Sequence, residues 1–346
     1  MKIQILAPLL LLLFSSGCWR EYPGNTPEEK IDYVITSAYA DGDFSGTVLV
    51  VRDSTVLYNK SFGFADAEKE IPNSHHTRFL LASVSKPFTA VLILQLIGEG
   101  GLTLTHTVAD FFPEVKNPEL LKITIHHLLS HTSGINDFVD LNGLKTFEPD
   151  HLMDVSTAFE PGEDFEYSSP GYILLAAIVE RVSGQSFESP LHEKIFGPLG
   201  MTRSGLARQH NFPDSLATGY ARDGDLLVPS PLPYPIEITD GAGSIYSTVE
   251  DLYKFDRALY TDSLLTKENR ERMFSHIIPN RFGYGWFLNE QGGVYYPWHT
   301  GEMNGATTAF VRPIQRNECI VILSNLENAG VTGMRQSILS ILKDAQ

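Results

Sequence analysis

The sequence predicts an α+β fold with an antiparallel five-stranded sheet that is built from both chain ends and flanked by helices. Two runs of β-forming residues, 46–52 and 56–62, lie near the start of the chain. Three more, 294–299, 307–312 and 318–324, lie near its end, and the sequence between the two groups has mainly helix and loop patterns. We therefore expect an inserted, mainly helical region beside the sheet.

The same pattern divides the chain into segments. We expect a sheet domain made of residues 31–82 and 236–346, and a mainly helical domain made of residues 83–235. Residues 19–30 contain two prolines, a glycine and several charges, which is typical of a tether. Residues 1–18 are predicted to be an export signal.

The two ends of the sheet region have recognisable connections. Asp53-Ser54-Thr55 separates the first two strand-like runs and predicts a hairpin. Apolar residues recur at helical spacing over 331–343, so we expect a terminal helix that covers one face of the sheet.

A buried helix is predicted over residues 86–97, because this run is apolar nearly all round. Pro87 must lie in the first turn of that helix, where its missing N–H costs little. Ser83 is therefore expected at the N-terminus of the helix. Three glycines that follow, at 98, 100 and 101, end it.

A second helix start is predicted at Ser247-Thr248-Val249-Glu250. Serine followed three residues later by glutamate is a capping-box pattern, and the apolar residues Leu252, Phe255 and Leu259 continue at helical spacing.

The first residues resemble an export signal. Lys2 precedes an apolar run over 3–14, which is too short to span a bilayer, and Ser-Ser-Gly-Cys18 follows, which resembles a lipoprotein processing box. We expect Cys18 to be lipidated and to provide the only membrane contact of the mature chain, with plain secretory cleavage as the alternative. Either outcome places the protein in the bacterial cell envelope, in the periplasm or anchored to the outer membrane.

The net charge and the cysteine content argue against a nucleic-acid-binding protein and against a disulfide-bonded one. The formal net charge of −16 argues against nucleic acid as a partner, since such binding relies on clustered Lys and Arg. The chain has two cysteines and one lies in the signal region, so no intramolecular disulfide is expected. Cys319 lies in an apolar strand-like run, where an inert buried thiol is expected.

Nucleophilic chemistry is indicated by Ser83-Val84-Ser85-Lys86. A spacing of three places Ser83 and Lys86 on one helix face, so the amine can reach the hydroxyl. Burial favours the uncharged amine that a base requires. A second Ser-x-x-Lys, at Ser340 and Lys343, lies in the last turns of the terminal helix and is interpreted as structural.

Three ordered segments carry a family resemblance. They are FLLASVSKPFTA at 79–90, ITIHHLLSHTSGI at 123–135 and PGEDFEYSSPGY at 161–172, and His299-Thr300-Gly301 follows on a predicted strand. Together they resemble the class C β-lactamase and penicillin-binding-protein superfamily, which includes DD-peptidases, D-aminopeptidases and carboxylesterases. The resemblance extends from about residue 33 to the end of the chain.

This resemblance implies roles for particular residues. Ser83 is the acylated nucleophile, Lys86 its base, and Tyr167 a phenolic base or proton shuttle toward the leaving group. His299 and Thr300 are expected to line the cleft and hydrogen-bond substrate.

The remaining implied roles belong to the backbone. The N–H groups of Ser83 and Glu302 are expected to hold the oxyanion. Gly301 is expected to leave room for a substrate to pair along its strand.

Two residues depart from the family pattern. Ser169 stands where an asparagine is usual, so the amide that contacts the lysine and a substrate amide is missing. His299 stands where many members have lysine, which weakens the attraction for a substrate carboxylate. The missing amide at Ser169 weakens the case for β-lactam and peptide substrates. A histidine at the position of His299 resembles the DD-peptidase and D-aminopeptidase relatives and argues against an efficient β-lactamase.

The expected protein is thus an exported serine hydrolase that acts through acyl-Ser83 on a small molecule or peptide, such as one derived from the cell wall. The alternative is a non-catalytic, penicillin-binding-like envelope protein. His127 and His131 lie four residues apart, but no third ligand accompanies them at a recognisable spacing, so neither a metal nor an organic cofactor is expected.

Overall fold

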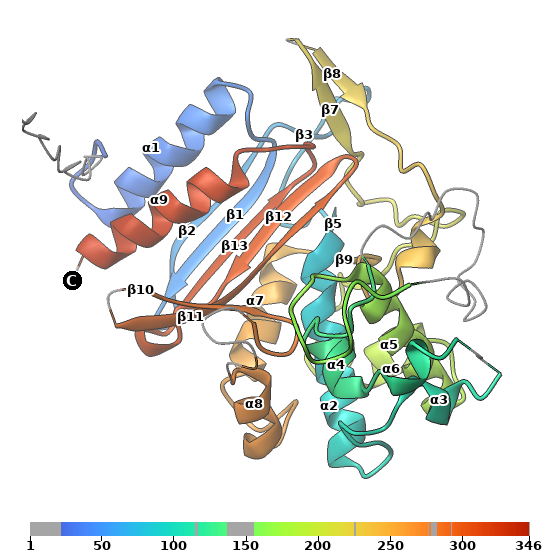
Figure 1. The fold of residues 1–346 in the computed structure, drawn as a ribbon. Helices are drawn as coiled ribbons and strands as arrows, with labels where there is room; N and C mark the ends of the chain where they lie inside the picture. The colour runs from blue at the N-terminus through green and yellow to red at the C-terminus, as the bar shows by residue number, and fades with distance from the viewer. Residues whose placement is uncertain are drawn as a thin grey trace, which may run out of the picture.

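Figure 1 shows a computed structural model of the chain, which describes residues 22–114, 117–136, 156–224, 226–275, 277, 282–291 and 293–345. Its main sheet has the strand order β10-β11-β12-β13-β1-β2, and all neighbouring strands are antiparallel. The strands at the two chain ends are therefore neighbours, as predicted. Their bounds are β1 (Gly46–Arg52), β2 (Thr55–Phe62), β10 (Phe287–Gln291), β11 (Val294–Met303), β12 (Ala306–Val311) and β13 (Glu318–Ser324).

The sheet has six strands, so the predicted number of five was wrong. The missed strand is β10, which forms one edge of the sheet. Its Leu288 is buried, whereas Asn289 and Glu290 are exposed. An edge strand is half solvated and needs little of the β-branched, apolar sequence on which the prediction relied. The predicted strand 294–299 is also longer in the structure, where β11 continues to Met303.

Helices cover both faces of the sheet (Figure 1). On one face, Val48 of β1 shares a buried cluster with Ile338 of the terminal helix, which confirms the predicted cover. On the opposite face, Leu49 shares a larger cluster with Phe88. The helices concerned are α1 (Pro27–Ala40) and α9 (Val331–Asp344) on the first face, and α2 (Lys86–Gly98) and α7 (Val249–Ala258) on the second.

Two predicted connections have a definite local geometry. The hairpin between β1 and β2 turns at Asp53 and Ser54, whose φ angles of 49° and 63° are those of a tight left-handed turn. The cap of α7 is Thr248, whose side chain accepts from the Asp251 N–H, so the predicted cap at Ser247 was one residue too early. Ser247 instead ends strand β9, where its hydroxyl bonds Ser204.

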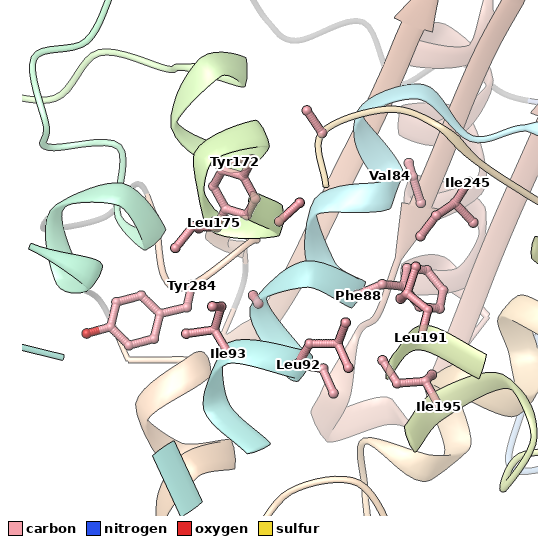
Figure 2. Close-up of a cluster of buried hydrophobic side chains, with 14 of the residues drawn as sticks. Val84, Phe88, Leu92, Ile93, Tyr172, Leu175, Leu191, Ile195, Ile245 and Tyr284 are labelled. Carbon is pink, nitrogen blue, oxygen red and sulfur yellow. The ribbon is translucent and has the colours of Figure 1, made fainter. Parts of the chain in front are cut away.

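Helix α2 runs through the centre of the helical region, as Figure 2 shows. Phe88 stacks on Phe255 of α7 with ring centroids 4.0 Å apart. On another side of α2 lie Tyr172 and Leu175, which come from α5 (Ser169–Ser183). Because α2 is surrounded by packed side chains, the turn that precedes it and carries Ser83 has little freedom to move.

Helix α1 begins at Pro27, so its first turn lies within the segment that was predicted as a tether.

The remaining elements are short. They are β3 (Phe64–Asp66), β4 (Ile71–Pro72), β5 (Phe79–Leu80), η1 (Ala82–Ser85), α3 (Val108–Phe111), η2 (Leu120–Lys122), α4 (Ile125–Leu129), α6 (Glu188–Leu191), η4 (His192–Phe196), β6 (Gly205–Leu206), β7 (Tyr220–Asp223), β8 (Leu226–Pro229), η5 (Ile236–Thr239), β9 (Ile245–Ser247), α8 (Lys267–Met273) and η6 (Ile314–Arg316).

Two sequence predictions concern the membrane and the cysteines. Within the part of the chain that the structure describes, every helix is too short or too polar to span a bilayer. Cys18 and the predicted signal lie outside the described residues. Cys319 is buried on β13, as expected, and burial raises the pKa of its thiol well above the usual value.

Candidate active site

Ser83 lies in η1, a single 3₁₀ turn that leads directly into α2. The residue before it, Ala82, has a φ of 49°, in the left-handed region that a residue with a side chain rarely adopts. The turn is held from both sides. The Leu81 N–H donates to the Ile245 carbonyl at 2.8 Å, and the Thr308 hydroxyl donates to the Leu81 carbonyl at 2.8 Å. Ser83 itself is partly exposed, so its hydroxyl is accessible.

Gly301 on β11 has a steric role that the sequence analysis did not anticipate. A Cβ atom at this position would lie 2.2 Å from the Leu81 carbonyl oxygen and 3.0 Å from the Ala82 Cβ. The space was predicted to serve substrate pairing, but the backbone beside Ser83 occupies it. Glycine is therefore required here because β11 and the nucleophile turn approach each other closely.

Lys86 is buried and directed at Ser83, as the Ser-x-x-Lys spacing predicts. Its Nζ atom donates to Ser83 Oγ at 3.0 Å and to the Ala242 carbonyl at 3.2 Å. It also donates to Ser169 Oγ at 3.3 Å. Ser169 thus makes the lysine contact implied for the missing asparagine, but it has no amide to offer a substrate.

Tyr167 lies beside the lysine. Its ring centroid is 4.7 Å from Lys86 Nζ, and the ring lies between His131, at 4.4 Å, and Phe287, at 6.0 Å. The packed rings fix the position of the tyrosine relative to Lys86. The structure therefore brings together Ser83, Lys86, Tyr167 and Ser169, which lie up to 86 residues apart in the chain.

His131 is part of this site, although its sequence was interpreted as a turn or a weak metal candidate. Its Nδ1 accepts the Ser168 N–H at 3.0 Å, and its carbonyl accepts the Glu166 N–H at 3.0 Å. Both bonds hold the segment that carries Tyr167. Burial lowers the pKa of His131 well below its usual value. The sequence signal that could have identified His131 as a site residue is its position in the family-like segment 123–135.

The described residues contain no group of three or more His, Cys, Asp or Glu side chains arranged to hold a metal ion. His131 uses Nδ1 for the Ser168 bond, and the side chain of His127 reaches back to its own helix start, where Nδ1 accepts the Thr124 N–H. Both imidazoles thus have structural partners.

His299 is buried on β11, and its Nδ1 donates to the Thr300 carbonyl at 2.6 Å. Burial, and secondarily the charge of Lys86, lowers the pKa of His299 to about 3. The imidazole is therefore neutral at physiological pH, with the proton assigned to Nδ1 by its hydrogen bond. The site consequently lacks, at position 299, the positive charge that a lysine would give to it.

The end of β11 forms one wall of the site. Strand β10 pairs with β11 only as far as Trp298, so the residues from His299 to Met303 extend beyond it. His299 and Thr300 were predicted to line the cleft, but the described residues of β11 that line the Ser83 cavity are Glu302 and Met303, and His299 is buried. Ser83, Ser169 and Glu302 line a common cavity of about 190 Å³. The predicted oxyanion residues Ser83 and Glu302 are thus on the same cavity. Tyr234 also lines it and was missed, because the loop 211–235 contains no recognisable motif.

Known proteins resemble this chain in sequence and in fold. The family model described as Beta-lactamase matches residues 31–343. Penicillin-binding protein 4* of Bacillus subtilis is 33% identical over 86% of this chain and 71% of its own. A crystal structure of a penicillin-binding protein from Bacillus halodurans is 28% identical, with a TM-score of 0.78 over 90% of this chain and 99% of that one. The D-amino acid amidase of Ochrobactrum anthropi, at 23% identity, shares the fold, with a TM-score of 0.79 over 90% of this chain and 96% of that one.

Because His299 is neutral in the folded protein, we expect the free energy of unfolding to decrease in acid. The unfolded chain protonates this histidine near pH 6.5, whereas the folded chain does so near pH 3, so stability is lost as the pH falls between these values. From pH 7 to pH 5 this residue alone should reduce the free energy of unfolding by about 2 kcal/mol. Urea titrations of the wild type and of His299→Gln at both pH values measure the difference. The exposed His75, replaced by Gln, is the control, and an equal pH dependence in all three proteins would contradict the prediction.

Proposed function

Since the chain belongs to the β-lactamase family, we propose that it is a serine hydrolase that acts on a small amide, peptide or ester through an acyl-Ser83 intermediate. The observation that carries this proposal is the 3.0 Å contact between Lys86 Nζ and Ser83 Oγ, because Ser83 lines a cavity with Ser169 and Glu302. A buried amine in contact with an accessible hydroxyl is the arrangement that activates a serine nucleophile.

The proposed reaction has two halves. Lys86 accepts the hydroxyl proton while Ser83 Oγ forms a bond to the substrate carbonyl carbon, and the N–H groups of Ser83 and Glu302 hold the oxyanion. Tyr167 passes a proton to the leaving amine or alkoxide as its bond to the carbonyl carbon breaks, and Lys86 returns the serine proton to Tyr167. Water then attacks the carbonyl carbon of the acyl-Ser83 ester, and its proton passes through the same groups to Ser83 Oγ as the acyl C–O bond breaks. The carboxylic acid leaves, and Ser83 is regenerated.

The charges around the site favour uncharged substrates. His299 is neutral, and Glu302 is exposed at the cavity, so a substrate carboxylate would meet no imidazolium and one nearby negative charge. Ser169 provides no amide for a substrate peptide bond. We therefore propose esters and neutral amides ahead of β-lactams as the substrates that turn over, while the names of the relatives support penicillin as a reagent that acylates Ser83.

Covalent labelling tests the nucleophile. A fluorophosphonate and a penicillin should each add one adduct to the wild type, which peptide mapping places on Ser83, and Ser83→Ala should remain unlabelled. Ser340 is exposed on α9, so Ser340→Ala should label like the wild type. An adduct on Ser340, or one that survives Ser83→Ala, would refute the proposal.

Turnover of nitrophenyl acetate separates a hydrolase from a non-catalytic binding protein. A hydrolase should release many nitrophenol molecules per protein molecule, whereas a protein that is only acylated would release one.

We also propose that the protein is exported and anchored in the bacterial cell envelope by a lipid on Cys18. The support is the sequence pattern at 1–18, followed by Pro23 and Gly24 before α1 begins at Pro27.

Fractionation tests the anchor. Expressed with its own signal in a Gram-negative host, the wild type should sediment with membranes, and Cys18→Ser should shift most of the protein to the soluble fraction. Cys319→Ser, which changes the buried cysteine, is the control and should sediment like the wild type. A Cys18→Ser protein that remains in the membrane fraction would exclude the lipid anchor.

A further inference from the structure

A second cavity of about 370 Å³ adjoins the one that contains Ser83. Tyr234 lines both cavities, so the two cavities meet at this residue. The second cavity is as large as typical small-molecule sites. Its walls are mostly apolar, and none of the described residues that line it carries a charge, although the whole chain has a net charge of −16. Its apolar side chains include Leu80, Phe212, Leu216, Leu232 and Ile236.

Strand β11 shows where this cavity lies relative to the reaction. At one end of the open segment, His299 lies beside Tyr167, with ring centroids 6.1 Å apart. Glu302 follows on the cavity of Ser83, and Asn304, just past the strand, lines the second cavity. The proton donor for the leaving group and the second cavity therefore lie toward opposite ends of this segment.

This order identifies the part of the substrate that faces the second cavity. In the proposed reaction the leaving group departs toward Tyr167. The other substituent of the same carbonyl, the acyl group, must then extend the opposite way, past Glu302 toward Asn304. Two residues of an extended strand span about 7 Å, which a chain of about five or six carbons matches.

We infer that the second cavity binds the apolar acyl chain of the substrate, and that the preferred substrates are esters or amides of medium-length fatty or arylalkanoic acids. The inference rests on the proposed function, since it takes Ser83 as the point of attack. Burial of each additional methylene should raise kcat/KM by about fourfold until the cavity is filled. An acetyl group, by contrast, is too short to pass Tyr234.

The test compares nitrophenyl acetate, hexanoate and octanoate as substrates of the wild type and of variants that fill the cavity. The octanoate-to-acetate ratio of kcat/KM should be roughly 50 or more in the wild type. Ala217→Phe places a ring in the cavity and should reduce that ratio at least tenfold. Leu232→Trp fills the cavity from the opposite loop and provides a second variant if the first does not fold. Leu226→Phe adds the same ring at an exposed position of β8, outside the cavity, and should leave both rates unchanged.

Two results would overturn the inference. One is a wild-type ratio near one, and the other is a high ratio that neither cavity-filling variant lowers. In both cases hydrolysis of the acetate would still support the proposed function. If the wild type hydrolyses no ester, the ester part of the proposed function fails, and the affinity for octanamide and acetamide, measured by calorimetry, decides about the cavity. Octanamide binding at least tenfold tighter, and lost in Ala217→Phe, would support the apolar site, and equal affinities would refute it.

Discussion

The close approach between strand β11 and the turn that carries Ser83 is the constraint on which the site depends. The Leu81 carbonyl accepts the hydroxyl proton of Thr308 from β12, and the absence of a side chain at Gly301 allows β11 to lie against that same carbonyl. Ala82 takes up a left-handed conformation in this turn. As a result, the N–H of Ser83 and the end of β11 border one cavity, although they come from opposite halves of the chain.

The site also depends on how many positive charges lie beside the ring of Tyr167. Three basic side chains, Lys86, His131 and His299, surround its ring. Burial lowers the pKa of both histidines, so neither adds a positive charge at physiological pH. The two histidines pack against the tyrosine ring and hydrogen-bond the neighbouring backbone, while we assign proton transfer to Lys86 and Tyr167. This division supports the proposal of a neutral substrate, as does the second cavity, whose described lining residues carry no charge.

Local sequence signals predicted where the nucleophile lies, the family resemblance indicated the other site residues, and nonlocal packing accounts for what both missed. Pro87 and the apolar run after it were enough to place Ser83 and Lys86 at the start of a buried helix. The strand β10 was missed because an edge strand needs little apolar sequence. Ser169 was identified by resemblance, but its contact with Lys86 depends on α5 packing beside α2, which no local pattern encodes. Tyr234 lies in a loop without a motif, so only the folded chain shows that it lines two cavities.

The central claim is that Lys86 activates Ser83, and the rate of Ser83 phosphonylation by a fluorophosphonate tests it most directly. The measurement compares the second-order rate constant of the wild type with that of Lys86→Met, a substitution that keeps the buried side chain long and apolar but removes the amine. Circular dichroism and thermal unfolding establish that the variant is folded. Loss of a general base should lower the rate constant by about 10²- to 10⁴-fold. A folded Lys86→Met protein that reacts within a few-fold of the wild type would contradict the assignment of Lys86 as the base.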